Sequence, residues 1–363
     1  MVSKDISSDG NGASSSRQRS EPLTCAIIVV NYCTPDHAVT CIRSVAAQSD
    51  PDKGWHIVLV DNASPDDSAE KLPRALADLI DAGFVTFLPL AHNGGFAWGN
   101  NQALLHLHDM GRKFEFAMLL NPDCVLELGA IDALIADMHD YPECAVNGSL
   151  LLNTDGSVTG CCFNFVTLGN EMIRALRLPG LGRMLGIAPV QIPPGTEREV
   201  GWVSGAACLI RTAALEQVGL MDDGFFLYFE EVELMHRIHR AGWTIRHVPS
   251  SRVVHIGGAS TGLLEGHARQ SDALPDYWHE SRRRYFSLIY GRILGRWATP
   301  IWLTGDSIAR VIGFFCHSRS LDTRADRAKM IAIGLQRKPH DHKPARICFG
   351  DGGGAPPTWM SFS

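Results

Sequence analysis

The segment Met118-Leu-Leu-Asn-Pro-Asp-Cys124 is the point around which the sequence is organised. An apolar run from Phe116 to Leu120 leads into it, and such a run is typical of a buried parallel strand. Pro122 has no N–H to donate to a neighbouring strand, so the strand ends there. Asp123 is therefore predicted at the carboxyl end of a central strand, where open α/β sheets bind ligands. Its carboxylate suits a divalent cation held against a diphosphate, although a simple Asx turn would use the same residues.

Strand and helix patterns alternate on both sides of this segment. Short apolar runs predict four strands, and each is followed by apolar residues at helical spacing. Four strand–helix units in succession predict a doubly wound parallel sheet. The predicted strands are Cys25–Tyr32, Trp55–Val60, Phe84–Leu90 and Phe116–Leu120, and the predicted helices are 35–48, 66–82, 95–109 and 129–141.

Polar residues mark the carboxyl end of every strand in this series. They are Asn31, Asp61, Asn93 and Asp123. In a doubly wound sheet these ends share one edge, which is where a nucleotide would bind. Each of them would also serve as a helix N-cap or turn residue, and the pattern alone leaves that interpretation open.

The pattern changes after Ala145. Residues 164–199 contain several Pro and Gly and are predicted to form an irregular loop, and a connection of that length usually has a function. Shorter elements are predicted around it: strands over 146–152, 157–163, 202–210, 244–248 and 253–255, and a helix over Phe229–Arg240.

Composition narrows the class of protein. The chain has 363 residues, 45% hydrophobic and 20% charged, which fits a soluble globular protein, and its net charge of −6 argues against nucleic-acid binding. The ten cysteines form no Cys-x-x-Cys pair, so we expect reduced thiols of a cytosolic protein and no zinc or disulfide framework. Met1–Glu21 lacks the apolar core of a signal peptide, and no run is long enough to predict a transmembrane helix.

The C-terminal part is basic. Ser281–Arg346 contains fourteen Lys and Arg against four Asp, and begins with Arg282-Arg-Arg284. We expect a helical, positively charged appendage. It would dock onto anionic lipid headgroups or a diphosphate-bearing lipid, or it would be an ordinary solvated basic face.

Several ordered segments of the chain together resemble the family 2 glycosyltransferases of the GT-A fold, in particular the bacterial rhamnosyltransferase-like branch. The resemblance spans about residues 24–260. The segments that carry it are Ala26–Tyr32, Val60–Ser64, Asn93–Asn101, Leu119–Asp123, Gly205–Arg211, Gly219–Leu234 and Val254–His255.

This resemblance implies a domain plan. It predicts a doubly wound mixed sheet flanked by helices, followed by a C-terminal helical appendage. A disordered segment is expected over 1–22, the GT-A domain over 23–265, a basic helical region over 266–346 and a flexible tail over 347–363.

The resemblance also implies how a nucleotide-sugar would bind. Asp61 would accept hydrogen bonds from the base or ribose, and Asn31 and Asn93 would line the same crevice. Gly94 and Gly95 would let backbone N–H groups approach the ligand, although a glycine pair equally serves a tight turn.

A metal site is implied at the end of the central strand. Asp123 would hold Mg²⁺ or Mn²⁺ against the diphosphate, and His255 would complete the metal shell. Asn121 stands where the family commonly has the first Asp of an Asp-x-Asp motif, and a neutral amide is a poorer ligand.

Acidic residues near Phe229–Arg240 are implied to be catalytic. An inverting displacement needs a base for the acceptor hydroxyl, and Glu231 matches the family's base, with Glu230 beside it. Asp222 would contact the acceptor or donor sugar. A solvated acidic first helical turn is the plain structural alternative.

The implied reaction is transfer of a sugar, with dTDP-rhamnose as the expected donor, to a cell-envelope polysaccharide or lipid-linked acceptor. The expected location is the cytoplasm or the inner face of the cytoplasmic membrane. Two alternatives stay open: a UDP- or GDP-hexose donor, and a non-catalytic sugar-nucleotide or glycan-binding module. An NAD-dependent dehydrogenase is disfavoured because no Gly-x-Gly-x-x-Gly follows the first strand.

Overall fold

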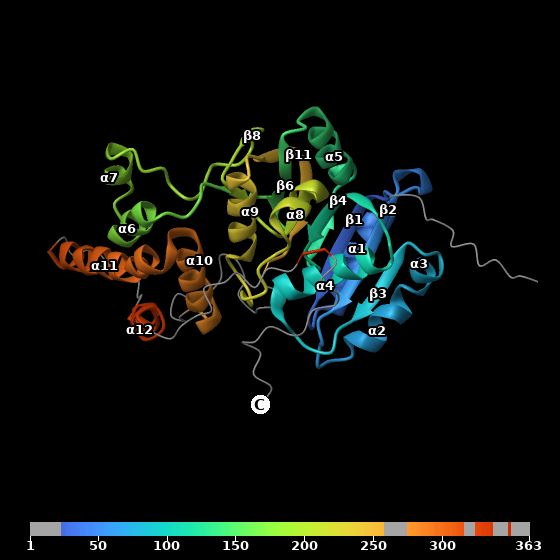
Figure 1. Cartoon of the computed structure of the whole chain (residues 1–363), viewed down its shortest axis with the longest axis horizontal. Helices are drawn as coiled ribbons and strands as arrows, with labels where there is room; N and C mark the ends of the chain where they lie inside the picture. The colour runs from blue at the N-terminus through green and yellow to red at the C-terminus, as the bar shows by residue number, and fades with distance from the viewer. Residues whose placement is uncertain (1–22, 258–273, 316–323, 337–347, 350–363) are drawn as a thin grey trace, which may run out of the picture.

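The computed structural model describes residues 23–257, 274–315, 324–336 and 348–349. A central mixed sheet has the strand order β3-β2-β1-β4-β10-β6-β11-β5, with β8 (Arg198–Glu199) added beside β11 (Figure 1). The parallel half contains the four predicted strands, which are β1 (Leu23–Asn31), β2 (Trp55–Asp61), β3 (Val85–Pro89) and β4 (Phe114–Leu120).

The second half of the sheet mixes strand directions. β10 (Ala207–Arg211) lies antiparallel between β4 and β6 (Cys144–Leu152), and β11 (Thr244–His255) runs parallel to β6. β5 (Cys124–Leu126) pairs with the end of β11 and so returns the chain after Asp123 to the sheet. The predicted mixed α/β fold is therefore confirmed.

Helices cover this sheet and join its strands. Their apolar faces pack on β-strands that are almost wholly buried, so the core is continuous from β1 to β11. The helices of this part are α1 (Pro35–Ala46), α2 (Ser68–Ala75), α3 (Ala77–Asp81), α4 (Gly95–Asp109), α5 (Ala130–Asp140), α8 (Thr212–Val218) and α9 (Glu230–Arg240), with a 3₁₀ turn, η1, at Pro51–Lys53.

Three sequence predictions need correction. The helix predicted over 66–82 is broken at Leu76 into α2 and α3, and α2 contains Pro73. The two last strands are one, since β11 continues through a bulge that shifts its register between Val248 and Arg252. The strand predicted over 157–163 shortens to β7 (Cys162–Phe163), which pairs with β9 (Trp202–Val203).

The irregular loop predicted over 164–199 is only partly present. The segment contains α6 (Leu168–Leu176) and α7 (Pro179–Met184), whereas 185–197 has neither helix nor strand apart from an isolated bridge. A capping box starts α6, because the Thr167 side chain accepts from the Asn170 N–H and the Asn170 side chain from the Thr167 N–H. Asn replaces the usual Glu or Gln of that motif, so the signal was easy to miss.

These two helices belong to a second lobe, seen at the left of Figure 1. It also contains α10 (Asp276–Leu294), a 3₁₀ turn η2 (Gly295–Trp297), α11 (Ala298–Phe315) and α12 (Arg324–Ala332), and α11 packs along α6. The predicted helical appendage is thus present, while the predicted disordered segment 1–22 and most of the predicted tail lie outside the described residues. Phe349, from that tail, packs against the rings of His108 and Phe114.

The arginines expected on the surface of the appendage are inside the molecule. Arg282 is 1% exposed and Arg284 is 7% exposed. Each side chain forms an ion pair with a buried carboxylate, Arg282 with Glu171 and Arg284 with Asp222. In the sequence this basic, aromatic segment has the pattern of a surface helix, because its acidic partners Glu171 and Asp222 lie far away along the chain.

Candidate active site

The ends of β1 and β2 bring Asn31 and Asp61 side by side, as their register predicts. The Asn31 Nδ2 donates to Asp61 Oδ1 at 2.9 Å, and the Asn31 Oδ1 accepts from the backbone N–H and hydroxyl of Thr34, just before α1. Asn31 is wholly buried, and its amide orients the Asp61 carboxylate. Ser64 Oγ also donates to Asp61, at 2.7 Å.

Asn62 is a site residue that sequence reasoning passed over. Its Nδ2 donates to Asn93 Oδ1 at 2.9 Å and to the carbonyl of Gly95 at 3.1 Å, which ties β2 to the start of α4. Its buried Oδ1 receives no hydrogen bond from the described residues. A buried acceptor at the ligand edge is suited to a donor group on a ligand. In the sequence, the only feature that could have pointed to Asn62 as a site residue is its position directly after Asp61.

The glycine pair serves the protein's own chain. Gly95 has φ +83°, and a Cβ there would lie 2.0 Å from the carbonyl oxygen of Phe226. The next N–H, that of Phe96, donates to the same oxygen at 2.9 Å. A Cβ on Gly94 would lie 2.2 Å from the Trp98 ring. The close backbone approach predicted for a ligand is therefore made by the loop before α9.

Asp123 and His255 meet at the end of the central strand, as the metal hypothesis requires. The His255 Nε2 lies 3.3 Å from Asp123 Oδ1, and both residues are less than 10% exposed. β11 brings His255 there by pairing it with Cys124 on β5. The Asn121 Nδ2 lies 3.5 Å from the same imidazole nitrogen.

The donor set at this point fits a hard divalent cation. One carboxylate and one imidazole leave most coordination positions for diphosphate and water, which is how Mg²⁺ or Mn²⁺ is usually held beside a nucleotide. The thiol of Cys124 completes the cluster of potential ligands. Burial raises the pKa of that thiol well above its usual range, so it stays protonated, and it donates to the carbonyl of Ala206.

A second group of potential ligands lies apart from this edge. Cys161, Cys162 and His247 place their ligand atoms within 4.8 Å of one another in a buried position. The Cys161 Sγ lies 4.0 Å from His247 Nε2. Spacing in the sequence gave no sign of this cluster, and it takes no part in the candidate site.

The two glutamates at the start of α9 occupy different environments. Glu230 is 3% exposed, and burial followed by the charge of Glu231 raises its pKa well above the usual range. Glu231 is partly exposed, but its Oε2 is enclosed and receives no hydrogen bond from the described residues. Burial raises the pKa of Glu231 to about 7. Glu231 is therefore the better base near neutral pH.

A short stretch before β10 links this glutamate to the metal-site residues. A Cβ on Gly205 would lie 3.6 Å from the Glu231 Cβ, so Glu231 borders this stretch. The carbonyl of the next residue, Ala206, accepts a hydrogen bond from the backbone N–H of Asn121 at 2.8 Å. The segment Gly205–Ala206 therefore lies between the start of α9 and the end of β4.

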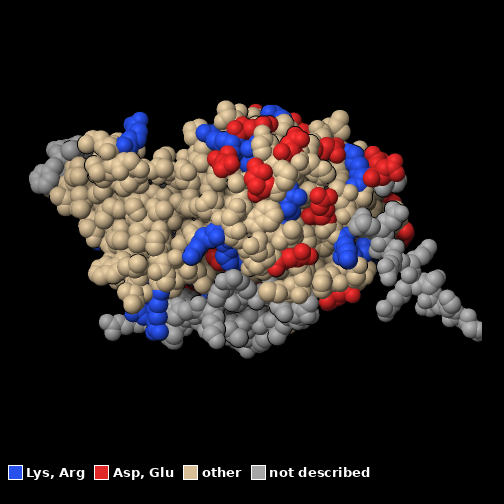
Figure 2. Space-filling model, turned by 45° about the horizontal axis from the view of Figure 1, so that its top comes forward, with Lys and Arg blue, Asp and Glu red and all other residues tan. Residues whose placement is uncertain are grey.

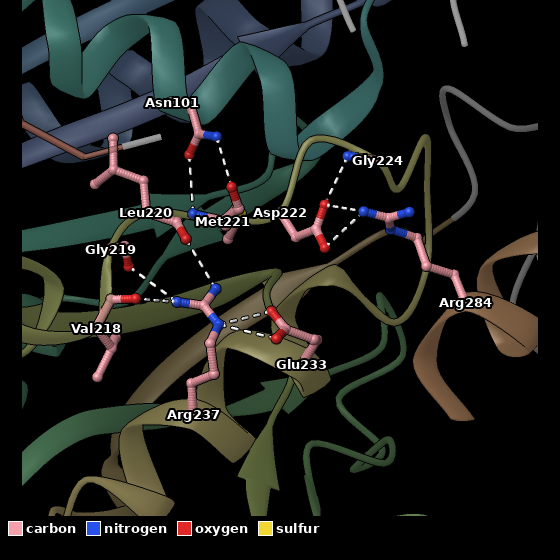
Figure 3. A network of polar contacts seen from close by, with 10 residues as sticks. All are labelled: Asn101, Val218, Gly219, Leu220, Met221, Asp222, Gly224, Glu233, Arg237 and Arg284. Carbon is pink, nitrogen blue, oxygen red and sulfur yellow. Dashed lines mark hydrogen bonds and ion pairs between the residues drawn. The ribbon is translucent and has the colours of Figure 1, made fainter. Parts of the chain in front are cut away.

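Asp222 has a structural role that differs from the predicted contact with a sugar. It is fully buried, and its carboxylate accepts from Arg284 Nη2 at 2.7 and 2.9 Å and from the Gly224 N–H at 2.8 Å (Figure 3). Gly224 is required by this contact, because a Cβ would lie 2.2 Å from the Arg284 guanidinium carbon. Asp222 therefore fastens the loop before α9 to α10.

The preceding part of that loop is braced as well. Arg237 of α9 donates to the carbonyls of Val218 at 2.7 Å and Leu220 at 2.8 Å, and its Nε pairs with Glu233 at 2.9 Å (Figure 3). Asn101 of α4 both donates to the Met221 carbonyl and accepts from its N–H. The loop ends in two residues with positive φ before Glu230. Such a conformation persists only when its surroundings hold it.

The chain is similar to known glycosyltransferases in sequence and in fold. Residues 26–158 match the family described as Glycosyl transferase family 2. Residues 26–158 therefore form a family 2 glycosyltransferase domain. This glycosyltransferase is 28% identical over 245 residues to an N-acetylglucosaminyl-diphospho-decaprenol L-rhamnosyltransferase of Mycobacterium tuberculosis, with 65% of this chain and 77% of the relative covered. It is 32% identical over 171 residues to the rhamnosyltransferase WbbL of Escherichia coli, with 44% and 60% covered.

Solved structures show that the transferase has the GT-A fold. The mannosyltransferase PcManGT of Pyrobaculum calidifontis, in complex with GDP-Man and Mn²⁺, superposes with a TM-score of 0.52 at 14% identity, covering 88% of this chain and 82% of that one. GalNAc-T7 with UDP, GalNAc and Mn²⁺ superposes with a TM-score of 0.51 at 16% identity, covering 74% and 48%.

Proposed function

We propose that this glycosyltransferase moves rhamnose from dTDP-rhamnose, with inversion, to a lipid-linked or polysaccharide acceptor of the cell envelope. Two curated relatives are named as rhamnosyltransferases, and one of them is named for a decaprenol-linked substrate. The observation that carries the proposal is Glu231, whose pKa is raised to about 7 and which borders Gly205, one residue from the Ala206 carbonyl that binds Asn121 at the end of the metal-site strand.

The residues divide the work of an inverting displacement. Glu231 takes the proton of the acceptor hydroxyl, whose oxygen attacks the anomeric carbon from the side opposite the phosphate. The bond between that carbon and the phosphate oxygen breaks, and the nucleoside diphosphate leaves with the electron pair. Asp61, oriented by Asn31 and Ser64, binds the base or ribose, and Asn62 offers its buried Oδ1 to the same ligand.

Asp123 and His255 would hold a divalent cation. The ion, when bound, neutralises charge on the departing diphosphate. Two solved structures of the same fold contain Mn²⁺ together with a nucleotide or nucleotide-sugar, which supports this assignment. Asn121 contributes its amide beside His255 in place of a second carboxylate.

A thermal-shift screen tests the donor. The purified protein is melted with dTDP-rhamnose, dTDP, UDP-hexoses or GDP-hexoses, each with and without Mg²⁺ or Mn²⁺. A ligand at about a hundred times its dissociation constant stabilises the folded state by ~2.7 kcal/mol. We expect a selective, metal-dependent shift with the dTDP compounds, and Asp123→Asn should remove the metal dependence.

Other outcomes reassign the function. A thermal shift with only a UDP- or GDP-hexose would support a glycosyltransferase that uses that donor in place of dTDP-rhamnose. Binding without any release of nucleoside diphosphate in the presence of acceptor would indicate a non-catalytic binding module. The absence of any shift would contradict the transferase proposal.

A further inference from the structure

α11 has its polarity reversed relative to an ordinary surface helix. Its charged group points inward: Asp306 is fully buried and pairs with Arg177 at 3.2 Å, Arg310 at 2.7 Å and Arg327 at 2.8 Å. The outward residues are apolar, with Ile308, Val311 and Ile312 between 40% and 57% exposed and Phe314 79% exposed. A surface helix normally turns its apolar face to the core and its charges to water.

The exposed apolar residues continue back through η2 into the end of α10. Gly291 has φ +74° and ψ 171° and kinks α10, after which Arg292 leads into η2 and α11. Beyond the kink, Ile293 is 77% exposed, and Leu294 and Trp297 are each 57% exposed.

Helical geometry places the exposed apolar side chains of α11 on one stripe. Successive residues of an α-helix turn by about 100°. On that count Ile308, Val311 and Ile312 lie within roughly 100° of one another, and Asp306 lies on the opposite side of the helix. Ile293, Leu294 and Trp297 are exposed on the segment that leads into this helix. We call these six side chains, together with the exposed Arg292 and Arg296, the apolar lobe face.

Charge distribution sets the helical lobe apart from the rest of the molecule. In the view of Figure 2 the lobe at the left is mostly uncharged, whereas the sheet-containing part carries many charges of both signs. Arg292 and Arg296, both exposed, alternate along the chain with the exposed Ile293, Leu294 and Trp297. Trp and Arg beside exposed aliphatic residues are typical of the boundary between lipid headgroups and acyl chains.

We propose that the apolar lobe face rests in the headgroup region of an anionic membrane. Anionic headgroups complement Arg292 and Arg296, while a second copy of the chain would bring the same arginines toward each other. None of the described helices is long and apolar enough to cross a membrane, so the contact is peripheral. This surface takes the place of the one predicted around Arg282 and Arg284, whose side chains form buried ion pairs, and the inference does not depend on the donor sugar.

The experiment is co-sedimentation of the full chain with vesicles. Phosphatidylcholine vesicles containing a quarter phosphatidylglycerol are compared with pure phosphatidylcholine vesicles. We expect binding to the anionic vesicles that weakens with salt. Arg292→Gln and Arg296→Gln should each reduce it roughly fivefold. Ile293→Ser combined with Trp297→Ser should reduce it by more than tenfold.

A matched control comes from the other part of the molecule. Leu128 is 89% exposed outside the apolar lobe face, and Leu128→Ser should leave vesicle binding unchanged. Melting temperature, measured for every variant, verifies folding, and the readout needs no catalytic activity. Vesicle binding that survives Ile293→Ser with Trp297→Ser in a folded variant would overturn the proposal. So would sedimentation velocity showing that this variant only abolishes self-association.

Discussion

At the scale of single residues, burial gives two neighbouring glutamates different chemistry. Glu230 is enclosed and held neutral by burial and by the charge next to it, whereas the pKa of Glu231 is raised to about 7. The sequence placed both at the start of a helix and the resemblance favoured Glu231. Only their surroundings supply a physical reason for that choice.

Replacing Glu231 tests its role as the base. Glu231→Gln keeps the shape of the side chain but cannot accept the acceptor's proton, so we expect kcat to fall ~100-fold or more with nucleotide affinity nearly unchanged. Turnover and nucleotide titrations measure the two effects. Exposed Glu216→Gln is the control. Near-normal turnover in Glu231→Gln would move the base elsewhere.

The pH dependence follows from the same carboxylate. A base acts only when deprotonated, and the pKa of Glu231 is about 7, so kcat should rise with pH through about 7 and level off above it. The wild-type profile, taken with saturating donor and acceptor, measures this directly. If kcat instead fell only near the ordinary pKa of glutamate, the base would be an exposed carboxylate and not Glu231.

At the scale of elements, the loop before α9 owes its shape to partners from other helices. Asp222 binds Arg284 of α10, and Met221 is held by Asn101 of α4. Gly95, which has no Cβ, leaves room for the backbone carbonyl of Phe226. The sequence identified this loop as functional but interpreted Asp222 as a ligand-facing residue. A carboxylate paired with a distant arginine has the same local signature as a catalytic one.

Three substitutions at the Asp222–Arg284 contact test whether it positions Glu231. Each substitution disturbs the contact in a different way. Arg284→Lys removes the planar guanidinium, Asp222→Asn removes the negative charge, and Gly224→Ala fills the space that the guanidinium occupies. All three should lower kcat tenfold or more while leaving the affinity for nucleotide within about twofold, because the nucleotide edge belongs to β1 and β2.

The controls for this contact separate positioning from simple loss of stability. Arg284→Met should lower kcat more than Arg284→Lys does, since the lysine ammonium group can still donate a hydrogen bond to Asp222. Arg252→Met removes a half-exposed pair with Glu127 and should leave kcat unchanged. If the defect appeared only in melting temperature, with kcat of the folded enzyme unchanged, the positioning role would be wrong.

At the scale of the whole molecule, α10 joins the helical lobe to the catalytic part. Arg282 Nε binds Glu171 of α6 at 2.7 Å, and Arg284, two residues on, binds Asp222. Burial alone would raise the pKa of Glu171, but Arg282 and Arg174 hold it below its usual value. The Arg284–Asp222 pair thus joins the lobe predicted as a separate basic appendage to the catalytic part, while the Arg282–Glu171 pair holds α10 against α6 within the lobe.

Breaking the Arg282–Glu171 pair should destabilise the fold strongly. Arg282→Met leaves the buried Glu171 carboxylate with only the half-exposed Arg174 as its ionic partner, so we expect a loss of about 3 kcal/mol, and adding Glu171→Leu should recover part of it. Because Glu171 has a lowered pKa, its stabilisation is present above pH 4.5 and is lost as pH falls further. The cost of Arg282→Met should therefore shrink in acid. Urea unfolding at pH 7 and 4 measures both effects, and equal costs at the two pH values would contradict this account.

The sequence by itself determined the parallel half of the sheet and its polar edge, and the resemblance of its ordered motifs indicated the family. The first two come from local rules, namely apolar runs ended by Asn, Asp or Pro and helical spacing between them. Only the tertiary structure decided which arginines are internal, which glutamate is poised and what the glycine pair contacts. The partners of Arg284 and Arg282 lie 62 and 111 residues away, and pKa values depend on burial, so neither could be deduced from neighbouring residues.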